Sequence, residues 1–281
     1  MTKQILKNLG IIILATILTV SVLGCKPKKK ATKLEKTTKT ETHVFSIEEK
    51  KGQLLLEKCL SAHGGIDKWN SFEGLEYNLV DNGKQVYQLT QLKDRRAYLK
   101  SKKYEVGFNG EVAWSVPDAS QVSGKSAAFY YNLDFYFIGI PFLLKDPGVS
   151  VIYNGKYMIS EKEYESIRIT FGAGIGLSPK DVYYLYFDPK TFELNILTYS
   201  ISYFDSENAR IKSAKVYSDY RKVQGLIMPH KMENFEWADG AMGKSKNHLR
   251  LFSNINFLLE IPDESLFEVP EGAVIEKLDG K

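Results

Sequence analysis

The sequence predicts a mainly β (α+β) domain, in which one N-terminal helix precedes a large curved antiparallel sheet, a half-barrel. Three observations predict it. Apolar residues recur at every second position over much of the chain, as in strands with one buried face. Asn-Gly and Asp-Gly pairs lie between these runs, where hairpin turns are expected. Tyr and Phe, which favour strands, number 17 and 15 of the 281 residues.

The start of the chain has the pattern of a secretory signal. Two lysines precede the apolar run Leu9–Val22, and a basic start, a short apolar core and a small residue before a cut site make such a signal. The cut site would be Leu-Gly-Cys, ending at Cys25, which closely resembles the bacterial lipobox. The resemblance implies cleavage before Cys25 and its acylation, palmitate included. Residues 1–24 are therefore expected to be a lipoprotein signal peptide.

The alternative for this segment is an uncleaved transmembrane anchor. A membrane-spanning helix needs roughly 20 apolar residues, whereas Leu9–Val22 is shorter and includes three hydroxyl side chains. We therefore favour a lipoprotein that acyl chains hold in the membrane. It would lie in the bacterial cell envelope and face the periplasm. The outer membrane is favoured over the inner one, because Lys26 and not Asp follows Cys25.

Residues 25–44 have the composition of a disordered basic tether. Lys and Thr dominate and large apolar residues are almost absent, so the segment cannot bury enough surface to fold. Its seven lysines would favour an anionic lipid surface by about 1 kcal/mol each. A soluble spacer explains the same composition, and the two interpretations do not exclude each other.

The net charge of +4 does not describe the folded body, residues 45–281. The leader and the tether hold nine Lys and two Glu, so 29 basic and 32 acidic residues remain of the 38 and 34 in the chain. The body is then slightly acidic, and no nucleic-acid partner is expected. With Cys25 acylated, Cys59 has no partner for a disulfide. We expect Cys59 to be a small buried apolar residue.

The body is expected to begin with an amphipathic helix. Residues 46–49, Ser-Ile-Glu-Glu, have the spacing of a capping box, and apolar residues then recur at helical spacing. Gly64-Gly65 supplies the positive-φ stop that is typical past a helix end. The pattern predicts a helix over 47–63 and a short helical turn over 66–72 that places Trp69 against the body.

From there the apolar pattern changes to a period of two residues. No helical segments alternate with these runs, so we expect an antiparallel meander of roughly ten strands rather than a parallel sheet. The clearest predicted strands are 85–90, 167–171, 197–203 and 249–257. Turns are predicted at Asn82-Gly83, Asn109-Gly110, Asn154-Gly155, Asp188-Pro189 and Asp239-Gly240.

Residues 129–144, FYYNLDFYFIGIPFLL, form the most apolar stretch of the body. Its dozen or so large apolar side chains are each worth about 1.5–3 kcal/mol when buried. The stretch is too short and too broken by polar residues, Gly and Pro to span a bilayer, and it lacks the alternation of a strand. We expect a helical or loop insertion across the concave face of the sheet. It would be either a permanent plug or a lid over a lipid pocket.

Motifs for catalysis and metal binding are mostly absent. The four histidines have no metal-site spacing, and the glycines of 172–176 lack the final glycine and the helix of a cofactor loop. His63-Gly64-Gly65 resembles the oxyanion motif of some esterases, but no Gly-x-Ser-x-Gly elbow accompanies it. A helix terminus is the simpler interpretation. No cofactor, metal or catalytic residue is expected.

These features together resemble the Lol lipoprotein carriers, the LolA/LolB-like superfamily. The segments Ala62–Trp69 (AHGGIDKW) and Phe135–Gly148 look like those of a group of Bacteroidota lipoproteins with that predicted fold. The resemblance covers residues 46–275. It implies a half-barrel that holds acyl chains against an apolar concave face, with helices as a lid. An anchored form is closer to the outer-membrane receptor of that system than to its soluble shuttle.

The favoured hypothesis is a lipid-anchored periplasmic protein that binds an acyl chain or another apolar ligand, with lipoprotein or lipid trafficking as its role. Trp114, Phe135, Phe137 and Phe142 would contact the ligand. The partners would be the membrane, through the lipid on Cys25, and an acyl-chain or lipoprotein ligand; a monomer is expected. Two alternatives stay open, a self-plugged structural or protein-interaction module of the envelope and, less favoured, a hydrolase.

Overall fold

The computed structural model describes residues 45–172, 178, 180–205, 207, 210–238 and 240–278. The expected signal peptide, the tether and Cys25 lie outside these residues, as does most of the glycine-rich loop after Gly172. Residues 44–281 form one compact unit. Its described part contains a hydrophobic core of its own, as expected of a unit that folds by itself.

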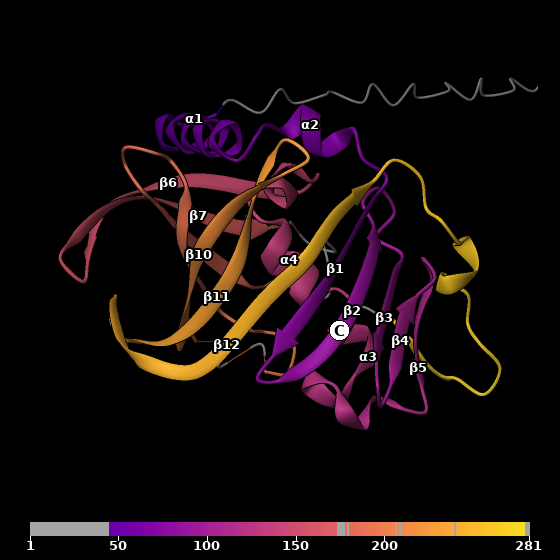
Figure 1. The fold of residues 1–281 in the computed structure, drawn as a ribbon. Coiled ribbons are helices and arrows are strands. Elements are labelled where there is room, and N and C mark those ends of the chain that lie inside the picture. The colour runs from indigo at the N-terminus through magenta and orange to yellow at the C-terminus, as the bar shows by residue number, and fades with distance from the viewer. Residues whose placement is uncertain are drawn as a thin grey trace, which may run out of the picture. The chain divides into compact units, whose positions relative to one another are not determined.

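The described chain forms one open, curved antiparallel sheet of thirteen strands (Figure 1). The strands are β1 (Gly74–Asp81), β2 (Lys84–Gln91), β3 (Ala97–Ser101), β4 (Glu105–Phe108), β5 (Val112–Val116), β6 (Val149–Ile159), β7 (Lys162–Phe171), β8 (Val182–Phe187), β9 (Leu194–Tyr199), β10 (Ser213–Val223), β11 (Leu226–Ala238), β12 (Ala241–Leu258) and β13 (Val274–Lys277). Their order across the sheet is β13-β5-β4-β3-β2-β1-β12-β11-β10-β9-β8-β7-β6. The mainly β fold with a large curved antiparallel sheet is confirmed.

Short helices accompany the sheet. They are α1 (Ile47–Ala62), α2 (Ile66–Asn70), α3 (Ala127–Tyr130) and α4 (Leu133–Gly139), with 3-10 turns η1 (Ala119–Gln121), η2 (Ser123–Lys125), η3 (Phe142–Lys145) and η4 (Glu264–Phe267). The predicted capping box begins α1: the Glu49 amide donates to Ser46 Oγ at 3.1 Å and the Ser46 amide to Glu49 Oε2 at 2.7 Å. Trp69 of α2 is buried, and its ring stacks on that of Phe142 with the centroids 4.6 Å apart. The predicted packing of Trp69 against the body is thus confirmed.

The strand order explains the apolar insertion. Strand β5 lies beside the edge strand β13, while β6 is the opposite edge of the sheet. The connection between them, residues 117–148, therefore has to cross the whole sheet. It carries α3, α4 and η3, and Figure 1 shows α4 inside the curve of the sheet. Phe135 and Phe142 are fully buried in the same core cluster as α1, so the predicted insertion across the concave face is confirmed.

The outer face of the first half of the sheet is covered by the chain that follows β12. Trp114 of β5 points to this face and donates from Nε1 to the Phe267 carbonyl at 3.0 Å. Its neighbour Ala113 points to the inner face and packs with the cluster of α3. Alternation along β5 thus separates Trp114 from the insertion.

Two local predictions were wrong. Asn154-Gly155 is not a hairpin turn but a bulge inside β6, where the register with β7 shifts and Gly155 has φ of 91°. A bulge commonly places a glycine at positive φ, so Gly155 is explained by the bulge and not by a hairpin turn. The predicted strand 197–203 ends at Tyr199, because the chain then turns to bind Asp181 through the Ser202 amide.

Candidate functional site

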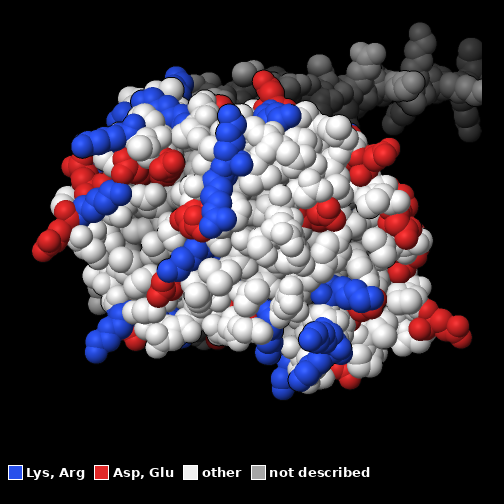
Figure 2. Space-filling view, in the orientation of Figure 1, with Lys and Arg blue, Asp and Glu red and all other residues white. Residues whose placement is uncertain are grey.

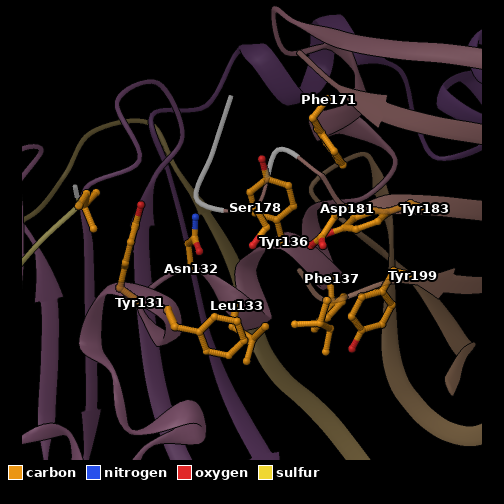
Figure 3. Close-up of a pocket in the computed structure, with 13 residues that line it drawn as sticks. Tyr131, Asn132, Leu133, Tyr136, Phe137, Phe171, Ser178, Asp181, Tyr183 and Tyr199 are labelled. Atoms are coloured by element: carbon orange, nitrogen blue, oxygen red, sulfur yellow. The ribbon is translucent and has the colours of Figure 1, made fainter. Parts of the chain in front are cut away.

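A pocket of about 310 Å³ lies between the insertion and the end of the sheet where β7 stops, β8 starts and β9 stops (Figure 3). This volume is at the small end of ligand pockets in proteins, and it suits one slender apolar group. The lining is mainly aromatic and aliphatic. It consists of Phe129, Tyr131, Asn132, Leu133, Tyr136, Phe137, Phe171, Ser178, Asp181, Tyr183, Tyr199, Ile201 and Leu278.

Four aromatic rings form a continuous wall of this pocket. The ring centroids of Phe171 and Tyr183 are 5.2 Å apart, those of Tyr183 and Tyr199 are 5.6 Å apart. Phe137 completes the row at 5.2 Å from Tyr199. The Phe171–Tyr183 and Tyr183–Tyr199 pairs are inclined by 77° and 67°, the edge-to-face packing that aromatic quadrupoles favour. The Phe137–Tyr199 pair is tilted by 54°. The wall joins the strand ends to α4.

Asp181 is the charged side chain of the described lining. It precedes β8, and Figure 3 shows it among the labelled rings, next to Tyr183. The Ser202 amide donates to Asp181 Oδ1 at 2.6 Å, and the Val182 amide donates to Ser200 Oγ at 2.8 Å. The first bond holds the carboxyl group of Asp181, and the second holds the backbone of the next residue. Burial raises the pKa of Asp181, while its bonds from Ser202 oppose the rise.

The tyrosine hydroxyls of the pocket remain protonated at physiological pH. Burial, with the nearby charge of Asp181, raises the pKa of Tyr183 well above its usual value. Burial raises the pKa of Tyr199 to about 12, although Arg250 opposes the rise. Neutral phenols both donate and accept hydrogen bonds, so the wall offers polar contacts as well as ring faces.

Buried polar groups next to the pocket tie α4 to the sheet. Arg250 Nε of β12 donates to Asp134 Oδ1 at 2.8 Å, and the Tyr217 hydroxyl donates to the Phe137 carbonyl at 3.0 Å. Lys215 Nζ lies 4.1 Å from the Phe137 ring centroid. Burial lowers the pKa of Lys215 well below its usual value, and repulsion from Arg250 lowers it further. Helix α4 is therefore part of the core, and the pocket is the space left open beside it.

Charges outside the pocket are mixed in sign. Figure 2 shows basic and acidic side chains lying next to one another around a broad uncharged area of one face. Several form exposed ion pairs, such as Arg221 with Asp219 at 2.6 Å. Within the described residues, no three His, Cys, Asp or Glu side chains come together as metal ligands would. None of the described helices is long and apolar enough to cross a membrane.

Residues 42–236 match the family described as "Family of unknown function (DUF6503)". The match covers more than half of the chain. The chain belongs to this family. A comparison with curated proteins gave no significant match.

Solved structures that are similar to this DUF6503 chain share little sequence with it. A DUF1329 family protein from Desulfovibrio piger has 11% identity and a TM-score of 0.48, over 79% of this chain and 98% of that one. A putative outer membrane lipoprotein-sorting protein domain from Vibrio parahaemolyticus has 7% identity and a TM-score of 0.46, over 78% and 97%. A LolA superfamily protein from Nitrosomonas europaea has 11% identity and a TM-score of 0.41, over 77% and 97%. The superfamily named from the sequence motifs is thus among the similar structures.

The four aromatic residues predicted to contact a ligand do not lie together. Phe137 lines the pocket. Phe135 and Phe142 belong to the filled core, where neither reaches the pocket lining. Trp114 lies on the outer face of the sheet against Phe267, because it alternates with inward-facing neighbours. Of the four, Phe137 alone belongs to the described lining of the pocket in this DUF6503 domain.

The pocket residues on the sheet were not identified from the sequence. Tyr183, Tyr199 and Asp181 come from strand ends that are far from the insertion along the chain. The alternation of aromatic residues around them predicts strands but does not indicate a pocket. An unpaired acidic residue at the start of an aromatic strand, as in Asp181-Val-Tyr-Tyr, is the local signal that could have singled them out.

His63 and Cys59 have the structural places expected of them. His63 ends α1, where its Nδ1 donates to the Ile227 carbonyl at 2.9 Å and its Nε2 accepts from the Leu194 amide at 3.2 Å. Burial lowers the pKa of His63, so the neutral ring is a cross-link between α1 and two strands. Cys59 is fully buried, and burial raises the pKa of its thiol well above the usual value, which disfavours the reactive thiolate.

Proposed function

We propose that this chain is a lipid-anchored protein of the bacterial cell envelope that binds a single apolar chain in the pocket beside α4. The observation that carries the proposal is the aromatic pocket between Phe137 and Tyr183, formed where an otherwise filled concave face stays open. Apolar, largely pre-formed pockets with a few polar groups are the usual form of small-ligand sites.

The anchor and the location belong to the same proposal. The Leu-Gly-Cys motif at Cys25 and the basic segment after it support acylation of Cys25 and attachment to a membrane on the periplasmic side, with the outer membrane favoured. The motif resemblance to the Lol carriers favours lipoprotein or lipid trafficking as the role. We propose that the chain acts as a monomer, with residues 25–44 as the tether of a single domain.

A binding role is preferred to catalysis for a chemical reason. Within the described lining, one carboxyl group, that of Asp181, faces the pocket without a histidine, cysteine or second acid. Nucleophilic catalysis usually places an activating base within hydrogen-bond reach of the nucleophile, and the described lining has no histidine or cysteine for such a pair.

Native mass spectrometry of residues 44–281, exported to the periplasm of a bacterial host, tests this function. We expect an added mass that organic extraction removes, and uptake of the neutral fluorescent probe N-phenyl-1-naphthylamine afterwards. Ile201→Trp should abolish the uptake, because Ile201 lines the pocket and is 43% exposed, so the larger ring can fill it without disturbing the core.

Ile47→Trp is the matched control, because Ile47 is 70% exposed on α1 and is not part of the pocket lining. Equal probe uptake by both variants would refute binding in this pocket. A ligand-free protein that takes up no probe would favour the second candidate, a self-plugged structural or interaction module. The observation in favour of that candidate is the burial of Phe135 and Phe142, which belong to the large core cluster on the concave face.

A further inference from the structure

The charge of the pocket is unbalanced within the described residues. Asp181 is only 6% exposed, and its Oδ1 accepts a hydrogen bond from the Ser202 amide. No described Lys, Arg or His pairs with this carboxyl group, and none lines the pocket. A buried carboxylate without an opposite charge is unfavourable. A positive group on a ligand would therefore be stabilised at this position.

The rings around Asp181 favour the same sign of charge. The faces of aromatic rings attract cations within about 6 Å of the centroid. Phe137, which lines the pocket, already has Lys215 Nζ at 4.1 Å from its centroid. Tyr183 and Tyr199 lie close enough to Asp181 for its charge to raise the pKa of both hydroxyls. The rings and the carboxylate thus lie on one wall of the pocket.

An anionic head group on a ligand would be destabilised in this pocket. It would lie beside the carboxyl group of Asp181, in a pocket of low polarity where repulsion between like charges is strong. Lys215 and Arg250 are near Phe137 and Tyr199, but neither lines the pocket. Lys215 bonds to Asn234 and Arg250 to Asp134 instead.

We propose that the pocket selects amphiphiles with a cationic head group, which places an ammonium beside Asp181 and an apolar chain against Phe137 and Leu133. This inference rests on the proposed binding function and adds the chemical class of the ligand. Burial raises the pKa of Asp181, and a bound ammonium would oppose that rise by stabilising the ionised carboxylate.

Calorimetric titration of residues 44–281 with decylamine, decanol and decanoate at neutral pH tests the inference, because the three share one chain and differ in head-group charge. We expect decylamine to bind about tenfold more tightly than decanol and decanoate to bind most weakly. Asp181→Asn should weaken decylamine binding by about tenfold and leave decanol unchanged. The amide oxygen can still accept the Ser202 hydrogen bond, so the pocket should keep its shape.

The outcomes separate the two proposals. If none of the three ligands binds, the proposed binding function is wrong. If all bind alike, or decanoate binds most tightly, the pocket is a binding site but the charge selection is refuted. The comparison of the three head groups uses the unaltered protein, so it decides the question even if Asp181→Asn fails to fold.

Discussion

Arg250 Nε donates a hydrogen bond to Asp134 Oδ1 at 2.8 Å, which joins strand β12 to helix α4 inside the sheet. Both side chains are buried. Arg250 also lies 3.5 Å from Asp81, measured between Nη2 and Oδ2, so one guanidinium compensates two carboxylates. Because neither charge of the buried pair is exposed to water, each needs the other.

Asp134→Asn should therefore lower the free energy of unfolding by up to about 3–5 kcal/mol, the usual effect of removing one partner of a buried pair, with Asp81 as the remaining partner of Arg250. Urea unfolding measures it. The matched control is Glu163→Gln, which breaks the exposed pair with Lys156 at 2.9 Å. That change should have an effect of about 0–1 kcal/mol. Similar losses in both variants would show that the buried pair is not special.

Gly52 determines how closely α1 packs on β6. A Cβ atom at this position would lie 2.7 Å from the Tyr153 nitrogen and 2.9 Å from the Ile152 carbonyl carbon, both backbone atoms. Alanine normally stabilises a helix by about 1 kcal/mol relative to glycine. At this position the effect of alanine on stability should be the opposite, because the added methyl group has no room. Gly52→Ala should destabilise the protein by about 1–3 kcal/mol.

Thermal and urea unfolding of Gly52→Ala check that reversal. Lys50→Ala, on an exposed position of the same helix, should change stability by less than about 0.5 kcal/mol. Stabilisation by Gly52→Ala would mean that α1 can move away from β6 without loss.

His63 should make stability depend on pH. Its folded pKa is lowered by burial, whereas the unfolded chain takes up the proton near pH 6.5. Below about pH 6.5 the unfolded state therefore binds more protons than the folded state. The stability that neutral His63 contributes is complete above this pH and is lost as the pH falls from about 6.5 to the lower pKa of the folded state.

Unfolding free energies of wild type and His63→Asn between about pH 8 and pH 5 measure the effect. The wild type should lose more stability over this range than the variant, by up to about 1.4 kcal/mol per pH unit. Two parallel curves would show that His63 is not a neutral cross-link in the folded protein.

Cys25 and Cys59 should differ completely in acylation. We expect the full chain to incorporate labelled palmitate and to sediment with membranes, and Cys25→Ser to lose both properties. Cys59→Ala should keep both, because Cys59 is fully buried in the core. A palmitate label that survives in Cys25→Ser would contradict acylation at the lipobox-like motif.

The helix, the main strands and the insertion could be predicted because each has a local signature. The capping box fixes where α1 begins, and the apolar excess of 129–144 requires burial wherever the chain goes. Strands β3, β4 and β13 have four or five residues each, too few for alternation to stand out. The sheet therefore has more strands than the roughly ten expected.

The pocket could not be predicted because it depends on partners that are distant in sequence. Tyr199 meets Phe137 through the packing of α4 against β9, and no period along the chain encodes that contact. Trp114 was predicted to contact a ligand, and its place outside the pocket could not be foreseen for a related reason. The sequence shows that it is a large aromatic residue, but the face of the sheet on which it lies depends on how β5 pairs with β4 and β13.

The cap of α3 has a consequence for the order in which the domain assembles. The Ser126 hydroxyl and the amides of Ala127 and Ala128 all donate to the carboxylate of Glu276 in β13, at 2.7, 2.8 and 3.2 Å. Glu276 follows Ser126 by 150 residues. A chain emerging from a ribosome or a translocon thus presents residues 129–144, the most apolar stretch of the body, long before that cap exists. The cap of α3 can form only after β13 has been synthesised. A chaperone that shields residues 129–144 until then would protect the protein from aggregation.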